Sequence, residues 1–291
     1  MNRPPRVGLK LVPMWTTLAE VRQTWRTADE AGFDHAWTFD HLNPTEGGVE
    51  GPVFDGWSLL AAAAETTRRV RIGCMVTGNT YRNPGYLAKL ATTVDHLSNG
   101  RLEFGIGAGW AEAEHTMLGL PFPSRGQRIR QMGEAVAIIR ALWTGKPIDF
   151  DGRYYRINAA IQQPVPLQKP APPVWIGGAG ENLTLRIVAE HADVWNYARQ
   201  DLEQAALLHR ALDRHCADIG RDPAEIIRSA QLDHLGDADA TLRRCEQLLG
   251  LGFEDLVIKI PTHEVERHAT VVAEQLLPRL RTLGTTPAGR S

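Results

Sequence analysis

Three short stretches contain residue types that could carry out proton transfer or redox chemistry. His41 follows Asp40, and an imidazole can give or take a proton near neutral pH. The run Gly-Ala-Gly-Trp at 107–110 places backbone without obstructing Cβ atoms beside a flat indole. The run Gly-Gly-Ala-Gly at 177–180 precedes a helical pattern, where N–H groups and the helix dipole favour a phosphate. Together these stretches indicate a site for a large, flat, phosphate-bearing molecule.

Each stretch also has a simpler explanation. Short glycine motifs are weak evidence, and both runs could do no more than make tight turns between a strand and a helix. His41 could be a loop histidine with satisfied hydrogen bonds, and Asp40 could influence it or cap the next segment. The run at 177–180 is no dinucleotide fingerprint, because Leu183 stands where its third glycine would be.

Composition excludes several classes of function. Apolar residues make up 43% and charged residues 23% of the 291 residues, which allows a large core. The formal net charge of -2 gives no electrostatic case for binding nucleic acid or an anionic membrane. No apolar run is long enough to span a bilayer, and the first residues lack the pattern of a signal peptide.

The cysteines and histidines give no sign of a disulfide framework or a metal site. Cys74, Cys216 and Cys245 are far apart and odd in number, which favours reduced thiols in a cytoplasmic protein. His263 and His268 are five residues apart, so they cannot clamp one metal from a helix, and we expect both at the surface. We therefore expect no metal.

Short apolar runs alternate with helical patterns along the whole chain. Thr17 and Glu20 form a capping box ahead of the first helical pattern, and Gly32 ends it. Asn83 and Pro84 start a later helix in the same way. The expected strands are 7–12, 34–39, 70–76, 102–106, 174–176, 193–197, 226–232 and 256–260.

Eight strand–helix units predict an α/β protein, a closed (β/α)8 TIM barrel, as a single domain of residues 1–291. Residues 144–173 interrupt the alternation with an Asp-Gly hairpin and a proline-rich connector, so we expect an excursion there, between the fourth helix and the fifth strand. In such a barrel the carboxyl ends of all strands meet at one mouth. That arrangement would bring the three stretches together.

Aromatic residues near the predicted strand ends would shape this mouth. Trp15, Trp37, Trp110, Trp195 and Tyr197 could line a pocket for a flat ring, although we expect Trp37 to be a core residue. A site with one protic side chain and much backbone and aromatic surface suits a redox ring that brings its own chemistry.

At these residues the chain resembles the luciferase-like flavin and deazaflavin oxidoreductases over nearly its whole length. So many ordered motifs are specific for this superfamily, and the resemblance implies a bacterial-luciferase-like TIM barrel with a flavin-type ring in its mouth. The matching segments are 34–41, 82–84, 97–101, 105–110 with Glu114, 119–122, 125–134, 173–178 and 193–195.

Within this superfamily the chain looks most like the branch that uses the 5-deazaflavin coenzyme F420. This resemblance implies that His41 is the proton donor or acceptor beside the ring. It also implies that the backbone at Cys74-Met75, often a non-prolyl cis peptide, backs the ring face, and that Gly177 and Gly178 meet the phosphate. The full set of expected coenzyme contacts is Asp40, Cys74, Met75, Thr77, Gly107, Ala108, Gly109, Trp110, Gly177 and Gly178.

One position departs from the branch. Trp110 stands where its sugar-phosphate dehydrogenases carry a catalytic glutamate, which favours a more apolar substrate. The leading hypothesis is hydride transfer between F420 and a small organic molecule. The alternatives are an FMN-dependent monooxygenase that uses reduced flavin and a non-catalytic flavin-binding protein. The resemblance also implies a homodimer.

Overall fold

A computed structural model describes residues 4–199 and 201–283 of the chain. Within these residues, eight parallel strands form a closed barrel in the order β3-β2-β1-β11-β10-β9-β8-β5, and β3 pairs with β5 to close it. The predicted TIM barrel is therefore confirmed. The strands are β1 (Arg6–Lys10), β2 (His35–Thr38), β3 (Arg71–Cys74), β5 (Leu102–Gly107), β8 (Val174–Gly177), β9 (Val194–Tyr197), β10 (Ile227–Asp233) and β11 (Asp255–Lys259), with the short β4 (Thr77–Gly78) paired to β5.

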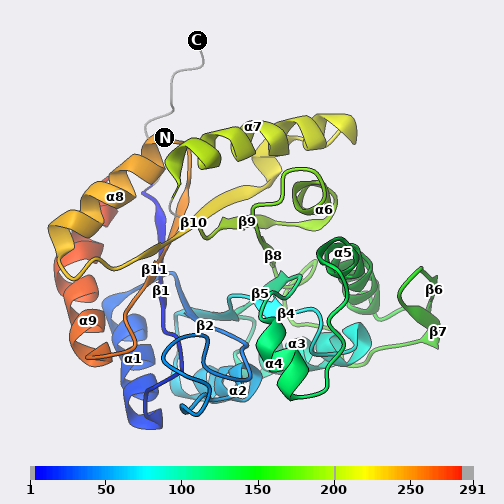
Figure 1. The fold of residues 1–291 in the computed structure, drawn as a ribbon, viewed down its shortest axis with the longest axis horizontal. Coiled ribbons are helices and arrows are strands. Elements are labelled where there is room, and N and C mark those ends of the chain that lie inside the picture. The colour runs from blue at the N-terminus through cyan, green and yellow to red at the C-terminus, as the bar shows by residue number, and fades with distance from the viewer. Residues whose placement is uncertain (1–3, 200, 284–291) are drawn as a thin grey trace.

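Helices surround the barrel on its outside (Figure 1). The predicted capping box of Thr17 and Glu20 starts the first of them, and Gly32 ends it in the left-handed conformation. Asn83 caps a later helix that begins at Pro84. The helices are α1 (Leu18–Ala31), α2 (Gly56–Thr66), α3 (Pro84–Leu97), α4 (Glu112–Met117), α5 (Arg125–Leu142), α6 (Thr184–His191), α7 (Leu202–Asp218), α8 (Ala238–Gly250), α9 (Val265–Val271) and α10 (Leu277–Thr282), with a π-helical turn (Val272–Leu276) between the last two and a 3-10 turn (Pro223–Glu225) before β10.

The expected excursion between the fourth and fifth units is present. Strands β6 (Ile148–Asp151) and β7 (Arg156–Ala160) form an antiparallel hairpin that projects beyond α5 (Figure 1). The proline-rich segment that follows packs back on α3. Gln162 donates to the Ala88 carbonyl at 3.2 Å, and His96 Nε2 lies 2.8 Å from the Val165 carbonyl. The excursion thus leaves the barrel wall without interrupting it.

Large aromatic and imidazole rings fill the amino-terminal half of the barrel interior. They fit there because glycines stand at neighbouring positions. A Cβ on Gly8 would collide with the His35 ring, and one on Gly73 would collide with Trp37. Trp37 and Trp175 then meet edge to face, with 4.6 Å between ring centroids. Because this level is fully packed, open space in the barrel is left only above it, toward the carboxyl ends of the strands.

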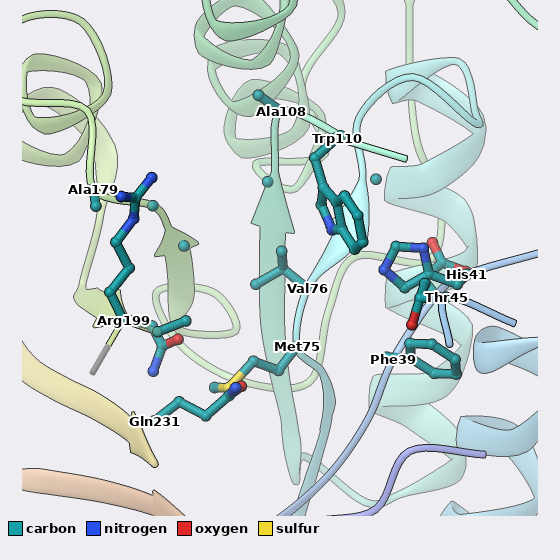
Figure 2. A pocket seen from close by; sticks show the side chains of 18 of the residues that line it. Phe39, His41, Thr45, Met75, Val76, Ala108, Trp110, Ala179, Arg199 and Gln231 are labelled. Atoms are coloured by element: carbon teal, nitrogen blue, oxygen red, sulfur yellow. The ribbon is translucent and has the colours of Figure 1, made fainter. Parts of the chain in front are cut away.

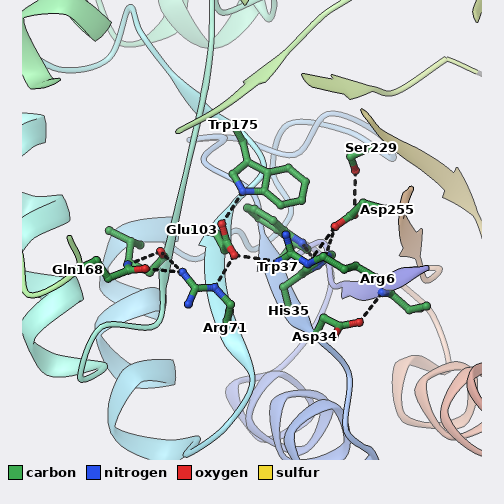
Figure 3. Close-up of polar contacts among 12 residues, drawn as sticks. Arg6, Asp34, His35, Trp37, Arg71, Glu103, Gln168, Trp175, Ser229 and Asp255 are labelled. Carbon is green, nitrogen blue, oxygen red and sulfur yellow. Dashed lines mark hydrogen bonds and ion pairs between the residues drawn. The ribbon is translucent and has the colours of Figure 1, made fainter. Parts of the chain in front are cut away.

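A network of polar side chains closes the amino-terminal end of the barrel (Figure 3). Glu103 accepts from Arg6 at 3.0 Å, from Trp175 Nε1 at 2.6 Å and from Arg71. Asp255 lies 2.9 Å from His35 Nε2, and its other carboxylate oxygen accepts from Ser229 at 3.0 Å. These buried charges are paired, as a stable core requires.

Two expectations about the whole chain are only partly covered by the described residues. No helix in 4–199 or 201–283 is long and apolar enough to cross a bilayer. Residues 1–3, 200 and 284–291 lie outside the description, so the domain boundaries at 1 and 291 stay predictions.

Candidate active site

A cavity of about 560 Å³ opens at the carboxyl ends of the strands. Figure 2 shows Trp110 and His41 on one side of it, Ala179 and Arg199 on the other, and Met75 with Gln231 toward its deep end. The structure brings nearly all of the predicted site residues together here. The cavity is lined by Asp40, His41, Met75, Gly107, Ala108, Gly109, Trp110, Gly177 and Gly178 among others.

Two of the predicted coenzyme contacts, Cys74 and Thr77, do not line the cavity. Successive side chains of a strand alternate in direction, so when Met75 faces inward Cys74 faces the surrounding core. Burial raises the pKa of the Cys74 thiol well above its usual value. The Thr77 hydroxyl is fully buried, accepts from Trp57 Nε1 at 3.0 Å and donates to Asp40.

The expected non-prolyl cis peptide is present one residue later than the resemblance implied. It joins Met75 to Val76 rather than Cys74 to Met75. Val76 is tightly surrounded by glycines, because a Cβ on Gly107 would lie 2.6 Å from its Cγ2 and one on Gly177 would lie 3.2 Å from its Cγ1. Both glycines therefore allow this segment to enter the barrel mouth, and they also line the cavity.

His41 is held by a carboxylate on α4. Its Nδ1 lies 2.7 Å from Glu114 Oε1, and the other carboxylate oxygen accepts from the backbone N–H groups of Leu42 at 2.7 Å and Asn43 at 3.2 Å. The Tyr81 hydroxyl also donates to Glu114. Burial raises the pKa of Glu114, but the hydrogen bonds from His41, Tyr81 and Leu42 outweigh it, so the pKa is lowered and the group is a carboxylate.

The hydrogen bond to Glu114 determines which ring nitrogen of His41 is available for proton transfer. An ionised Glu114 can only accept hydrogen bonds, so His41 Nδ1 must be the donor. His41 Nε2 makes no hydrogen bond among the described residues, and the ring lines the cavity 5.2 Å from the centroid of Trp110. The free nitrogen can accept a proton when the ring is neutral and donate one when the ring is protonated.

Asp40 anchors the loop that carries His41. Arg82 donates to its two carboxylate oxygens at 2.5 and 3.0 Å, and Thr77 donates as well. Burial raises the pKa of Asp40 even though the Arg82 charge opposes this. Both oxygens thus have protein partners, and the side chain fixes the position of the neighbouring imidazole.

The cavity is lined by five cations that the sequence alone did not reveal, which are Lys10, Arg125, Arg128, Arg199 and Lys259. Lys10 and Lys259 occupy directly paired positions of β1 and β11, and Lys259 lies 3.4 Å from Asp233. Arg199 is exposed at the mouth and forms no ion pair among the described residues. A lysine that ends an otherwise apolar strand was the signal that could have revealed Lys10.

The aromatic residues divide between core and site. Trp37, Trp195 and Tyr197 are fully buried, so the expectation that Trp37 belongs to the core is confirmed. Trp15 packs beside the loop glycines at 47 and 51 and does not line the cavity. Trp110 lines it and is 66% exposed.

Of the two histidines expected at the surface, His263 is exposed, as predicted, but His268 is not. His268 is buried, not at the surface, because its ring packs 5.2 Å from that of His234. In residues 4–199 and 201–283, no group of three or more His, Cys, Asp or Glu side chains could hold a metal ion.

The family model described as luciferase-like monooxygenase matches residues 3–244. The chain belongs to this family. A relative from Amycolatopsis mediterranei, an F420-dependent glucose-6-phosphate dehydrogenase, is 28% identical over 88% of this chain and 93% of its own. An F420-dependent hydroxymycolic acid dehydrogenase from Mycobacterium tuberculosis is 29% identical over 76% of this chain and 60% of its own.

Solved structures agree on the fold. An F420-dependent secondary alcohol dehydrogenase, solved with an F420–acetone adduct, superposes with a TM-score of 0.84 at 18% identity. The alignment covers 94% of this chain and 98% of that one. At this identity the likeness shows the barrel fold.

Proposed function

We propose that the protein transfers a hydride between coenzyme F420 and a small, apolar organic substrate, with His41 as the proton donor or acceptor. The observation that carries the proposal is the free Nε2 of His41 inside the cavity, with its Nδ1 held by the Glu114 carboxylate. The two relatives named as F420-dependent dehydrogenases support the choice of coenzyme.

The residues around the cavity fit a deazaflavin with a phosphate-bearing tail. Met75 and Val76 offer an apolar surface for a ring. Ala179 and the exposed Arg199 lie across the cavity from His41 (Figure 2), where a cation suits a phosphate. The glycine backbone at 177–178 lines the cavity just before Ala179, with the Gly178 N–H donating to the Asn196 carbonyl at 3.2 Å. When bound, the coenzyme would supply the carbon that gives or takes the hydride.

His41 would manage the proton that accompanies the hydride. For an alcohol, His41 Nε2 would accept the hydroxyl proton as the hydride leaves the carbon, and Glu114 would stabilise the imidazolium that results. For the reverse reduction the same nitrogen would return the proton. Asp40 and Arg82 would keep the loop in place during either step.

Trp110 supports an apolar substrate. Its indole is 66% exposed beside His41, in the place where a sugar-phosphate dehydrogenase is expected to carry a glutamate. Phe39 and Ile129 also line the cavity. One relative is named as an F420-dependent hydroxymycolic acid dehydrogenase, so sugar phosphates are not the only substrates named among the relatives.

A titration of the purified protein with F420 and with FMN tests the coenzyme. We expect saturable binding of F420 at micromolar concentration, seen as a change in its fluorescence, and weaker binding of FMN. The His263→Ala variant, which changes an exposed histidine outside the cavity, should bind F420 as the wild type does. No F420 binding at micromolar concentration would refute the proposal.

The family description favours a second function, an FMN-dependent monooxygenase that uses reduced flavin. Oxygen uptake with reduced FMN, together with no binding of F420, would support it. A non-catalytic flavin-binding protein is the third possibility. It predicts tight binding of the coenzyme and no turnover that His41→Ala can abolish.

We further propose that the protein is a cytoplasmic homodimer. The cytoplasmic assignment draws support from its cysteines, Cys74, Cys216 and Cys245, which are all buried free thiols. The dimer rests on the resemblance to the superfamily. Light scattering on the eluate of a sizing column should give twice the mass of one chain, and a single-chain mass would exclude the dimer.

A further inference from the structure

Lys10 is a buried cation without an anionic partner. Its side chain leaves the carboxyl end of β1 and is 8% exposed. The Nζ donates to the Met75 carbonyl at 2.8 Å and to Gln231 Oε1 at 2.7 Å, and it forms no ion pair within 4.0 Å in residues 4–199 and 201–283. Burying an unpaired charge costs free energy, so its presence calls for an explanation.

The two acceptors leave one N–H group of the protonated Lys10 without a hydrogen-bond partner. A protonated lysine has three N–H donors, and the Met75 carbonyl and the Gln231 amide take two of them. Lys10 also lines the cavity. Its remaining N–H therefore has no partner in the described protein, at a place where a ligand would lie.

The position of Lys10 favours the coenzyme over the substrate as the acceptor. Met75 and Gln231 lie toward the deep end of the cavity, away from Trp110 and His41 (Figure 2). Lys10 holds the carbonyl of Met75, which belongs to the segment proposed to back the coenzyme ring. The free N–H of Lys10 would therefore lie beside the edge of a coenzyme ring stacked on this segment.

The surroundings of Lys10 lower its pKa and so favour its neutral form. Burial first, and then the ammonium of Lys259 on β11, lower the pKa of Lys10 to about 7. Asp233 on β10 acts in the opposite direction but does not compensate, and the neighbouring Cys74 thiol on β3 is uncharged because burial raises its pKa. The proton on Lys10 is thus held more weakly than on an exposed lysine.

We propose that Lys10 is a coenzyme-binding residue whose third N–H donates to an acceptor atom on the edge of the F420 ring and favours its reduced form. This inference rests on the proposed function. A hydride brings two electrons and one negative charge into the ring, so a neighbouring ammonium stabilises the reduced coenzyme more than the oxidised one.

Binding measurements on two variants test the inference without turnover. Oxidised and reduced F420 are titrated under anaerobic conditions into wild type and Lys10→Met, with coenzyme absorbance and fluorescence as the readouts. At pH 6 we expect Lys10→Met to weaken binding of the reduced form by about tenfold, as for a charge-assisted hydrogen bond, and to weaken the oxidised form less. Gln231→Glu gives Lys10 an anionic partner in nearly the same shape, and should weaken the reduced form in the same direction.

The pH dependence separates a charge from a mere packing role. Because Lys10 loses its proton as the pH rises through about 7, wild-type affinity for the reduced coenzyme should fall between pH 6 and pH 8.5. The comparison is with Lys10→Met at the same pH, which cancels the titration of the coenzyme itself. A wild-type curve parallel to that of Lys10→Met would overturn the inference.

A second lysine of the cavity serves as the matched comparison. Lys259→Met removes a cation from the paired position on β11, but its ammonium lies beside Asp233. At pH 6, below the pKa of Lys10, we expect Lys259→Met to change the binding of the two redox states less than Lys10→Met does. An effect on the reduced form as large as that of Lys10→Met would indicate that any nearby cation suffices and would overturn the specific contact. A variant that binds both redox states as tightly as wild type but raises KM for substrate would assign Lys10 to the substrate instead.

The same titration distinguishes failure of this inference from failure of the proposed function. If wild type binds no F420, both are refuted. If wild type binds F420 and Lys10→Met matches it in both redox states, only the role of Lys10 is refuted. A thermal melt of each variant shows whether it is folded, and Gln231→Glu carries the test if Lys10→Met is not.

Discussion

Two histidine–carboxylate pairs lie at opposite ends of the barrel and differ in their hydrogen bonding. At the closed end, His35 is fully buried, its Nε2 lies 2.9 Å from Asp255, and its Nδ1 accepts from Trp37 Nε1 at 2.6 Å. At the mouth, His41 Nδ1 lies 2.7 Å from Glu114, but no described group meets its Nε2. In the first pair both ring nitrogens of the histidine have protein partners, whereas in the second pair Nε2 is left available to a ligand.

The difference teaches how to separate a structural polar group from a functional one. Tryptophan N–H can only donate, so His35 must carry its proton on Nε2 and can neither give nor take one without breaking the network. His41 keeps one nitrogen available to a ligand. Charged groups show the same contrast. Glu103 at the closed end accepts from three donors, while Lys10 at the deep end of the cavity has one N–H group without a partner among the described residues.

Removing the mouth histidine should have the largest effect. His41→Ala is expected to lower kcat by about 10²- to 10⁴-fold, the usual contribution of a general acid or base. Its melting temperature should stay close to that of wild type, because the side chain borders a cavity. Steady-state kinetics with F420 and a thermal melt measure both quantities, and full activity in the variant would break the comparison.

Removing the buried histidine should do the reverse. His35→Ala leaves the Trp37 N–H without an acceptor and takes one partner from Asp255, so we expect a loss of about 3 kcal/mol in the free energy of unfolding. Activity per folded molecule should be retained. Urea denaturation measures the loss, and a variant that is stable but inactive would contradict the structural role.

Glu114→Gln should have an intermediate effect on activity, a decrease of about tenfold in kcat, because an amide orients His41 less firmly and does not stabilise an imidazolium. The stability difference from wild type should depend on pH. Since folding lowers the pKa of Glu114, its contribution is complete above its unfolded value of 4.5 and disappears as the pH falls through the folded value. The melting temperatures of wild type and Glu114→Gln should therefore converge as the pH is lowered from 7 to 3. A difference that stays constant over this range would contradict the lowered pKa of Glu114.

Arg199→Ala should give the smallest effect. Its guanidinium is exposed and has no ion-pair partner among the described residues, so we expect a decrease of only about threefold in F420 affinity at low salt. The effect should vanish near 1 M salt, because exposed charges are screened. An effect that persists at high salt would place Arg199 in a desolvated contact.

Local patterns were enough to predict the architecture. The alternation of strand and helix, the caps at Thr17 and Asn83, and the excursion at 144–173 all appear in the structure. Each of these signals is a local pattern of about thirty residues or fewer, and within a helix or strand the spacing of apolar residues determines which face is apolar. The glycine runs and His41 were found for the same reason, since a barrel fixes the mouth once its strand ends are known.

Side-chain partners across the barrel were beyond prediction. His41 and Glu114 are 73 residues apart, and Lys10 reaches Met75 and Gln231 across 65 and 221 residues. The direction of Cys74 depended on the phase of β3, which shifting the strand by one residue would invert.

By itself, then, the sequence determined which elements form and which end of the barrel carries the chemistry, because both follow from local periodicity. Only the tertiary structure decided which polar groups are satisfied and which are left for a ligand. That outcome depends on strand register and on loops from distant parts of the chain, so a linear pattern does not contain it.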